Sequence, residues 1–223
     1  MAVLQKLMLG FADSLAINDF LIDPDSARKE ILSAERFYRG DDANYPGYVG
    51  TLSDELRDTI FSRLEQIIDY KIKPCATGDM DLSARLSLKG EERLAKSFVH
   101  CDPHPYVAIL YLTPDEYVPD SIPYGTTIYE TRMHGLNTVL YNSLKPSFRK
   151  KWTKEEFEPL AEECKKQTFN LPFWRKIDYV EFKYNRLCII EGQRFHSACP
   201  MFFGEKREEG RLTVTFFFEL DCL

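Results

Sequence analysis

The feature of this 223-residue sequence that most restricts its fold is a change in character near Pro74. Before that point, apolar residues such as Leu56, Ile60 and Leu64 recur at helical spacing. After it, the chain consists of short β-branched or aromatic segments separated by turns. Helices followed by strands predict an α+β chain whose strands form a mostly antiparallel sheet.

Three helices are expected. Residues 26–38 follow the turn Asp23-Pro24-Asp25, and the apolar residues from Leu56 to Ile68 have the clearest helical spacing, with Thr51 and Asp54 as candidate caps of their helix. Residues 153–167 are charged but keep one apolar stripe, which predicts a helical insertion laid against the sheet. We expect Pro159 to kink this helix or to delay its start.

Six segments after residue 74 predict strands, because they are apolar and end at Gly, Pro or Asn turns. They cover residues 82–88, 107–112, 126–130, 179–184, 187–190 and 212–220. We expect a single domain in which the sheet closes as a barrel or double sheet. Its N-terminal helical layer covers 1–73, and its sheet core covers 74–223 with the insertion at about 145–176.

The composition disfavours several classes of protein. The formal charge is −6 and no extended stripe of Lys or Arg is present, so we expect no nucleic-acid partner. The apolar stretch 7–12 is interrupted by Gly10, and nothing approaches the roughly 20 apolar residues of a membrane span, which predicts a cytoplasmic protein without a membrane partner. The six cysteines include no CxxC pair, which indicates reduced thiols.

His100 and Asp102 stand two residues apart where an apolar strand begins. In an extended chain this spacing places them on one face, with Cys101 on the other. An HxD pair is common by chance and requires a third ligand. His196, at the start of an extended segment after the Gly192 turn, is the natural candidate. Two histidines and one carboxylate suit Fe(II) and leave positions for a chelating cosubstrate and dioxygen.

Arg211 is a candidate cation for the distal carboxylate of a 2-oxoacid cosubstrate. Its planar guanidinium matches a carboxylate, and it opens the last predicted strand. The period of two places Thr213 on the same face, where its hydroxyl can bond the same carboxylate. The pair therefore favours 2-oxoglutarate as cosubstrate.

The order of these motifs resembles the Fe(II)/2-oxoglutarate-dependent dioxygenase superfamily, nearest to its prolyl-hydroxylase-like branch. The order is HxD, a Gly-Thr strand at 125–129, the segment NRLCIIEGQRFHSACP and then RxT. The resemblance spans about residues 98–218. A weaker similarity is present at Asp19-Phe20-Leu21, where such proteins often begin their first strand. It implies a double-stranded β-helix, or jelly roll, with iron between its sheets. It also implies that 2-oxoglutarate and O2 are consumed, succinate and CO2 are released, and a substrate C–H bond is oxidised, most often to an alcohol.

The sequence departs from this pattern at two places. The interval from His196 to Arg211 is somewhat long, which a hairpin loop at 204–210 explains, so Arg211 is preferred over the loop residue Arg207. Leu110 stands where related hydroxylases often carry a tyrosine, so the remaining polar contact to the cosubstrate is assigned to Tyr106, Tyr111 or another residue. Asp102 disfavours halogenation, because halogenating relatives replace this carboxylate with a small residue.

Three further residues each have two interpretations. His104 is an extra metal ligand in the pattern HxDxH, or an exposed or site-adjacent histidine that could contact the substrate, because Pro103 and Pro105 bend the chain. Arg194 faces the substrate pocket and meets a carboxylate, or is a surface strand residue. Trp174 lines a lid over the site, or anchors the packing of the insertion.

Together these features predict an enzyme that hydroxylates an unactivated C–H bond of a small molecule, an amino acid or a peptide. One alternative is a jelly-roll protein that keeps the pocket but serves as a binding or scaffolding module. Another is a cupin-like metal dioxygenase that does not use 2-oxoglutarate. Substrate and oligomeric state stay open, because loops and a few polar groups set specificity in such sites.

Overall fold

The computed structural model describes residues 13–34, 38–39, 46–75, 82–91, 94–120, 123–144, 152–200 and 202–221. Its helices are α2 (Pro24–Ser33), α3 (Asp54–Ile68) and α5 (Lys154–Lys166), and 3₁₀ turns cover Asp115–Tyr117, Tyr141–Ser143 and Leu171–Phe173. Its strands are β1 (Ser14–Ile17), β2 (Tyr38–Arg39), β3 (Tyr48–Thr51), β4 (Ile72–Pro74), β5 (Ser83–Ser87), β6 (Tyr106–Tyr111), β7 (Gly125–Thr131), β8 (Trp174–Glu181), β9 (Leu187–Glu191), β10 (His196–Cys199) and β11 (Arg211–Leu220).

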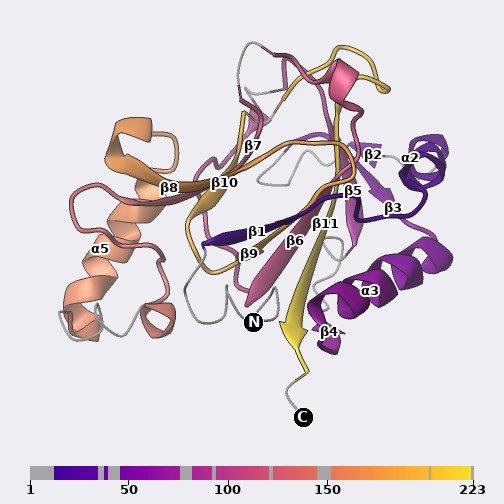
Figure 1. Ribbon diagram of the computed structural model, residues 1–223. Helices are drawn as coiled ribbons and strands as arrows, with labels where there is room; N and C mark the ends of the chain where they lie inside the picture. The colour runs from indigo at the N-terminus through magenta and orange to yellow at the C-terminus, as the bar shows by residue number, and fades with distance from the viewer. Residues whose placement is uncertain are drawn as a thin grey trace.

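The strands form two antiparallel sheets, as the sequence predicted. The larger sheet has the order β1-β9-β6-β11-β5-β3-β2, with β4 also paired to β11, and the smaller has the order β10-β7-β8. An isolated bridge between His100 and His196 places the His100 segment beside β10. Figure 1 shows the layers, with α2 and α3 on the side of the larger sheet and α5 on the side of the smaller.

Helices α2 and α3 cover the outer face of the larger sheet. Helix α3 begins after Ser53, whose hydroxyl accepts a hydrogen bond from the Leu56 amide, and it buries Leu56, Ile60, Leu64 and Ile68 along one stripe. These side chains pack with the sheet residues Ala84, Leu86, Ala108, Leu110, Leu212, Val214 and Phe216. Each fully buried aliphatic side chain contributes about 1.5–3 kcal/mol, so this layer holds much of the stability of the fold.

The alternate side chains of each strand point to the inner face of the larger sheet, away from the helices. On β11, Leu212 and Val214 face the helices, so strand alternation turns Arg211 and Thr213 toward the smaller sheet. A second apolar cluster fills part of the space between the sheets and includes Val107, Tyr111, Ile128, Phe182, Phe203 and Phe217. The space between the sheets therefore combines an apolar core with polar residues from β11.

The insertion packs on the outer face of the smaller sheet. Thr153 and Glu156 form a capping box at the start of α5, which buries Phe157, Ala161 and Cys164. Pro159 lies inside α5, and the helix continues through it to Lys166.

Several predicted boundaries shift. The first helix ends at Ser33, and residues 35–37 of the prediction lie outside the described residues. Strand β8 begins at Trp174, earlier than the predicted residue 179, and β1 precedes Asp19-Phe20-Leu21, which forms the turn after it. The N-terminal layer is also not purely helical, because β1 and β3 join the larger sheet. No helix within the described ranges is long and apolar enough to cross a membrane.

Candidate metal centre

His100 and His196 are neighbours across a main-chain bridge. The His100 amide donates to the His196 carbonyl at 3.0 Å, and the His196 amide donates back at 2.9 Å. The Asp102 amide donates to the Gly192 carbonyl at 2.8 Å, which keeps the chain extended so that Asp102 and His100 share one face. Two short stretches far apart in sequence thus bring three candidate ligands together.

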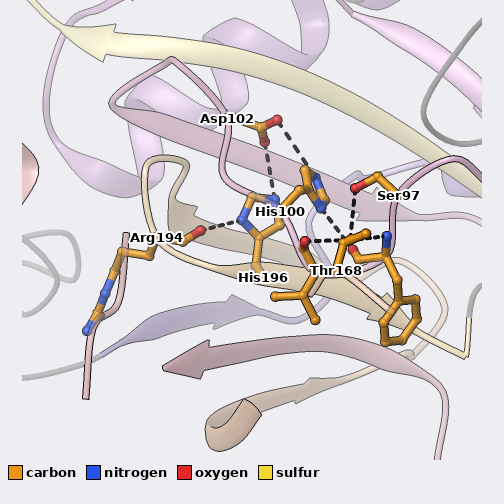
Figure 2. A network of polar contacts seen from close by, with 8 residues as sticks. Ser97, His100, Asp102, Thr168, Arg194 and His196 are labelled. Carbon is orange, nitrogen blue, oxygen red and sulfur yellow. Dashed lines mark hydrogen bonds and ion pairs between the residues drawn. The ribbon is translucent and has the colours of Figure 1, made fainter. Parts of the chain in front are cut away.

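The side chains of these three residues converge, as Figure 2 shows. His196 Nε2 lies 3.2 Å from Asp102 Oδ2, and His100 Nε2 lies 3.8 Å from Asp102 Oδ1. One ligand atom from each residue lies within 4.8 Å of the others. The prediction that His100, Asp102 and His196 form one cluster is confirmed.

Backbone carbonyls orient both imidazoles. His196 Nδ1 lies 2.8 Å from the Arg194 carbonyl, and His100 Nδ1 lies 3.0 Å from the Phe98 carbonyl. Because a carbonyl oxygen only accepts, each Nδ1 carries the proton and donates it. In the neutral tautomers, the Nε2 lone pairs of both rings therefore point toward the Asp102 carboxylate.

The electrostatic environment favours the metal-binding forms of these groups. Burial lowers the pKa of His100 to about 4, and the charge of His196 acts in the same direction. Burial alone would raise the pKa of Asp102, but the hydrogen bond that His196 donates when its ring is also protonated at Nε2, together with the charges of His196, His100 and His104, outweighs it. The pKa of Asp102 therefore lies below its usual value. At neutral pH, His100 is uncharged and Asp102 is ionised.

This donor set fits a divalent cation. Two imidazole nitrogens and one carboxylate oxygen converge from one side, which is the facial arrangement typical of non-haem Fe(II). A cation between them would satisfy three lone pairs at once and would interact with the ionised carboxylate.

Gly192 lets the two ligand-bearing segments approach closely. A Cβ at this position would lie 2.7 Å from the His104 carbonyl oxygen and 3.4 Å from Asp102 Cβ. The sequence showed Gly192 only as a turn residue. In the structure, the segment that holds Asp102 can pack closely here because glycine has no side chain.

Arg211 and Thr213 share one face of β11, as predicted, and this is the inner face of the larger sheet. Thr213 is the register partner of Tyr111, and both are buried. The Arg211 guanidinium lies 5.6 Å from the centre of the Phe182 ring, on which Tyr111 stacks from 4.4 Å. The Tyr111 hydroxyl also lies 2.7 Å from Thr126 Oγ1. These residues form a closed polar end of the space between the sheets.

Tyr106 does not belong to this group. Its ring stacks on Phe218 at 5.4 Å and packs against the core under the helices. Tyr106 and Tyr111 are separated by an odd number of positions on β6, so strand alternation sends them to opposite faces. Of the two tyrosines named from sequence, only Tyr111 faces the inner side.

The guanidinium of Arg194 does not point into the site. It is buried, pairs with Asp13 and lies 3.7 Å from a Glu191 carboxylate oxygen, and Figure 2 shows it directed away from Asp102. Arg194 acts on the site through its carbonyl instead. His104 stays beside the ligands, with its ring 4.8 Å from that of Phe217.

Trp174 is a packing anchor and not part of a lid. Its indole N–H donates to the Gln167 carbonyl at 2.9 Å, and its ring lies 4.6 Å from that of Phe195. Phe195 and the ligand His196 are consecutive, so alternation places Trp174 on the outer side of the smaller sheet.

Sequence reasoning missed the role of Thr168. Its hydroxyl accepts from the Phe98 amide at 2.7 Å, contacts Ser97 Oγ at 3.2 Å and donates to the Val99 carbonyl at 2.8 Å (Figure 2). These contacts hold the stretch whose Phe98 carbonyl orients His100. Nothing in the spacing connects a residue just after α5 to the segment 97–100, so no sequence signal could have found it.

Residues 4–218 match the model of the family of unknown function DUF6445. The chain belongs to this family. No protein of curated function matches the sequence of this DUF6445 member.

Solved structures show which fold this DUF6445 chain has. It is similar to the non-haem α-ketoglutarate-dependent epimerase SnoN from nogalamycin biosynthesis, at 12% identity and a TM-score of 0.52, over 96% of this chain and 80% of SnoN. The predicted resemblance to Fe(II)/2-oxoglutarate-dependent enzymes is thus confirmed for the fold.

Two further matches have lower TM-scores. An N-substituted L-amino acid dioxygenase from Burkholderia ambifaria AMMD matches at 16% identity and a TM-score of 0.48, covering 99% of this chain and 87% of its own. A prolyl hydroxylase from Trichoplax adhaerens matches at 14% identity and a TM-score of 0.44. The match covers 97% of this chain and 87% of the hydroxylase chain.

Proposed function

We propose that this protein is a non-haem Fe(II)/2-oxoglutarate-dependent oxygenase. The observation that carries the proposal is the orientation of the two imidazoles. Hydrogen bonds from Nδ1 to the Phe98 and Arg194 carbonyls turn both Nε2 atoms toward Asp102. A hydrogen-bonded pair of structural histidines would not need this shared orientation toward one carboxylate.

The path of the chain supports a double-stranded β-helix as the fold of a single domain. Strand β5 lies in the larger sheet, the His100 segment lies beside the smaller sheet, and β6 returns to the larger. Strands β7 and β8 then lie in the smaller sheet, β9 in the larger, β10 in the smaller and β11 in the larger. This alternation winds the chain around the space that contains the ligand cluster.

In this proposal His100, Asp102 and His196 hold the iron, and Arg211 binds the distal carboxylate of the cosubstrate with the Thr213 hydroxyl. When bound, Fe(II) with 2-oxoglutarate and O2 supplies the oxidation of a substrate C–H bond, with release of succinate and CO2. Phe182 and Tyr111 exclude water around Arg211, which strengthens its attraction for a carboxylate. The Phe98 and Arg194 carbonyls keep the ligand imidazoles in place during turnover.

We further propose hydroxylation of a small molecule, an amino acid or a peptide as the outcome, in which the product gains one oxygen atom. The name of SnoN assigns it epimerase activity, so the mass of the product must be measured. The first test is metal binding. Native mass spectrometry should find one divalent ion per wild-type chain and none in His196→Ala or Asp102→Ala. Full metal occupancy in both variants would contradict the assigned ligands.

A further inference from the structure

The turn at 192–195, which joins β9 to β10, positions two of the three candidate ligands. The Gly192 carbonyl accepts a hydrogen bond from the Asp102 amide at 2.8 Å. Two residues later, the Arg194 carbonyl accepts a hydrogen bond from His196 Nδ1 at 2.8 Å. A movement of this turn would therefore displace Asp102 and His196 together.

The side chain of Arg194 anchors this turn. Only 5% of it is exposed, although it carries a full charge. The guanidinium pairs with Asp13, and its Nε lies 3.7 Å from a Glu191 carboxylate oxygen. A buried charge is costly unless it is paired. The two carboxylates therefore hold the guanidinium, and with it the turn, in one place.

Asp13 comes from the N-terminal segment and not from the strands that carry the ligands. It directly precedes β1, which pairs with β9 so that Ser14 lies opposite Ile190. Continued by one residue, this register places Asp13 opposite Glu191, and Arg194 bridges the two carboxylates. Like charges that lie opposite each other on paired strands repel, so the bridge also holds β1 against β9.

We propose that Asp13 is a positioning residue of the metal centre, which acts on Asp102 and His196 through Arg194 and the turn at 192–195. The inference rests on the proposed function, because it concerns how the same site holds its metal. Coupling between two parts of a protein is reciprocal, so a bound metal and the attachment of β1 stabilise each other. The N-terminal strand is thus part of the metal site as well as the edge of the larger sheet.

Zn(II) titration of the full-length protein against a competing chelator tests this proposal. Asp13→Asn should weaken Zn(II) binding by roughly tenfold, the lower end of the range for groups that orient a ligand. Asp13→Glu, which keeps the carboxylate, should restore part of the affinity. Ser14→Ala is the matched control, because it removes the hydrogen bond from β1 to Asp178 of β8 and leaves Arg194 paired. It should bind Zn(II) as wild type does.

A double variant shows whether Asp13 acts through Arg194. Arg194→Gln alone should weaken Zn(II) binding about as much as Asp13→Asn. The two substitutions together should weaken it by roughly tenfold and not by roughly a hundredfold, because both remove the same ion pair.

The imidazole protons separate positioning from a general loss of stability. In the Zn(II)-loaded wild-type protein, NMR should find slow exchange with water for the Nδ1 protons of His196 and His100, which donate to carbonyls. In Asp13→Asn, the His196 proton should lose its slow exchange. The His100 proton should keep it, because the Phe98 carbonyl lies outside the turn.

The proposal is overturned if Asp13→Asn binds Zn(II) as tightly as wild type, or if Ser14→Ala weakens binding as much as Asp13→Asn does. It is also overturned if the effects of Asp13→Asn and Arg194→Gln add, or if both imidazole protons lose slow exchange together. A wild-type protein that bound no Zn(II) would instead contradict the proposed function.

Discussion

The Thr168 hydroxyl donates a hydrogen bond to the Val99 carbonyl at 2.8 Å, which joins the end of the helical insertion to the strand that carries His100. The same oxygen accepts from the Phe98 amide, so one side chain fixes the two residues that precede the ligand. The Phe98 carbonyl then orients the His100 ring. The insertion is thus connected to the metal centre through hydrogen bonds and not only through apolar packing.

Replacing Thr168 with Val should therefore weaken metal binding by roughly tenfold, the lower end of the range for groups that orient a ligand. Thr168→Ser, which keeps the hydroxyl, should restore most of the affinity. Zn(II) titration against a competing chelator measures both. Thr153→Val is the matched control, because it removes the cap of α5 but leaves the hydrogen bonds of Thr168 to Phe98 and Val99 intact. It should lower stability by about 1 kcal/mol and leave metal affinity unchanged. Equal metal affinities in Thr168→Val and wild type would show that the hydrogen bonds of the Thr168 hydroxyl do not position His100.

Arg211→Gln should raise the dissociation constant of 2-oxoglutarate by roughly 10- to 100-fold, because the variant loses a charged, bidentate partner of the carboxylate. Metal affinity should not change. Arg207→Gln, in the exposed loop before β11, is the control and should bind 2-oxoglutarate as wild type does. Calorimetry on the Zn(II)-loaded protein checks this assignment. If the loop variant lost affinity and Arg211→Gln did not, the anchor would be Arg207.

Acidification should destabilise the metal-free protein through His100. The pKa of His100 is lowered from 6.5 to about 4 by burial, so the folded state favours the neutral ring. As pH falls from 6.5 toward 4, the unfolded chain takes up a proton that the folded chain resists, and the free energy of unfolding decreases. The loss at pH 5 is about 2 kcal/mol.

Urea unfolding at pH 7 and pH 5 in the presence of a chelator measures this effect. In His100→Gln, the decrease on acidification should be smaller by about that amount. Asp102 does not interfere in this window, because its lowered pKa places its proton uptake below 3.8. The same decrease in both proteins would mean that His100 is not held neutral by burial.

Asn185 holds the N-terminal segment to the sheet. Its side chain accepts from the Leu21 amide at 2.8 Å and donates to the Leu21 carbonyl at 2.9 Å, and its φ is 57°. Asn185→Ala leaves two buried backbone groups unpaired and puts alanine in the left-handed region, which asparagine tolerates better. We expect a loss of about 3 kcal/mol in thermal or denaturant unfolding. A loss under 1 kcal/mol would contradict this role.

Local patterns were sufficient to predict much of the fold. Apolar spacing in α3, the apolar stripe of α5 and the alternation of β11 all act within a few residues, so they are visible in the sequence, although the cap of α3 is Ser53 and not the predicted Thr51 or Asp54. Strands β1 and β3 were missed because they are short and pair with residues far along the chain. Their partners are chosen by tertiary packing, which local periodicity does not encode.

The metal site likewise has features that follow from local spacing and features that follow from long-range contacts. The HxD spacing and the RxT strand predicted which side chains share a face, because a strand has a period of two. The period also separates Tyr106 from Tyr111, once the register of β6 is known. The roles of Thr168 and of the Arg194 carbonyl depend on contacts that spacing alone does not reveal.

The most direct test of the proposed function is succinate formation by the wild-type protein incubated with Fe(II), 2-oxoglutarate and O2, compared with the same mixture under chelation, without O2, and with His196→Ala. The proposal predicts succinate in the complete wild-type reaction and none above background in the other three. Absence of succinate from the complete reaction, or equal succinate with His196→Ala, would contradict it.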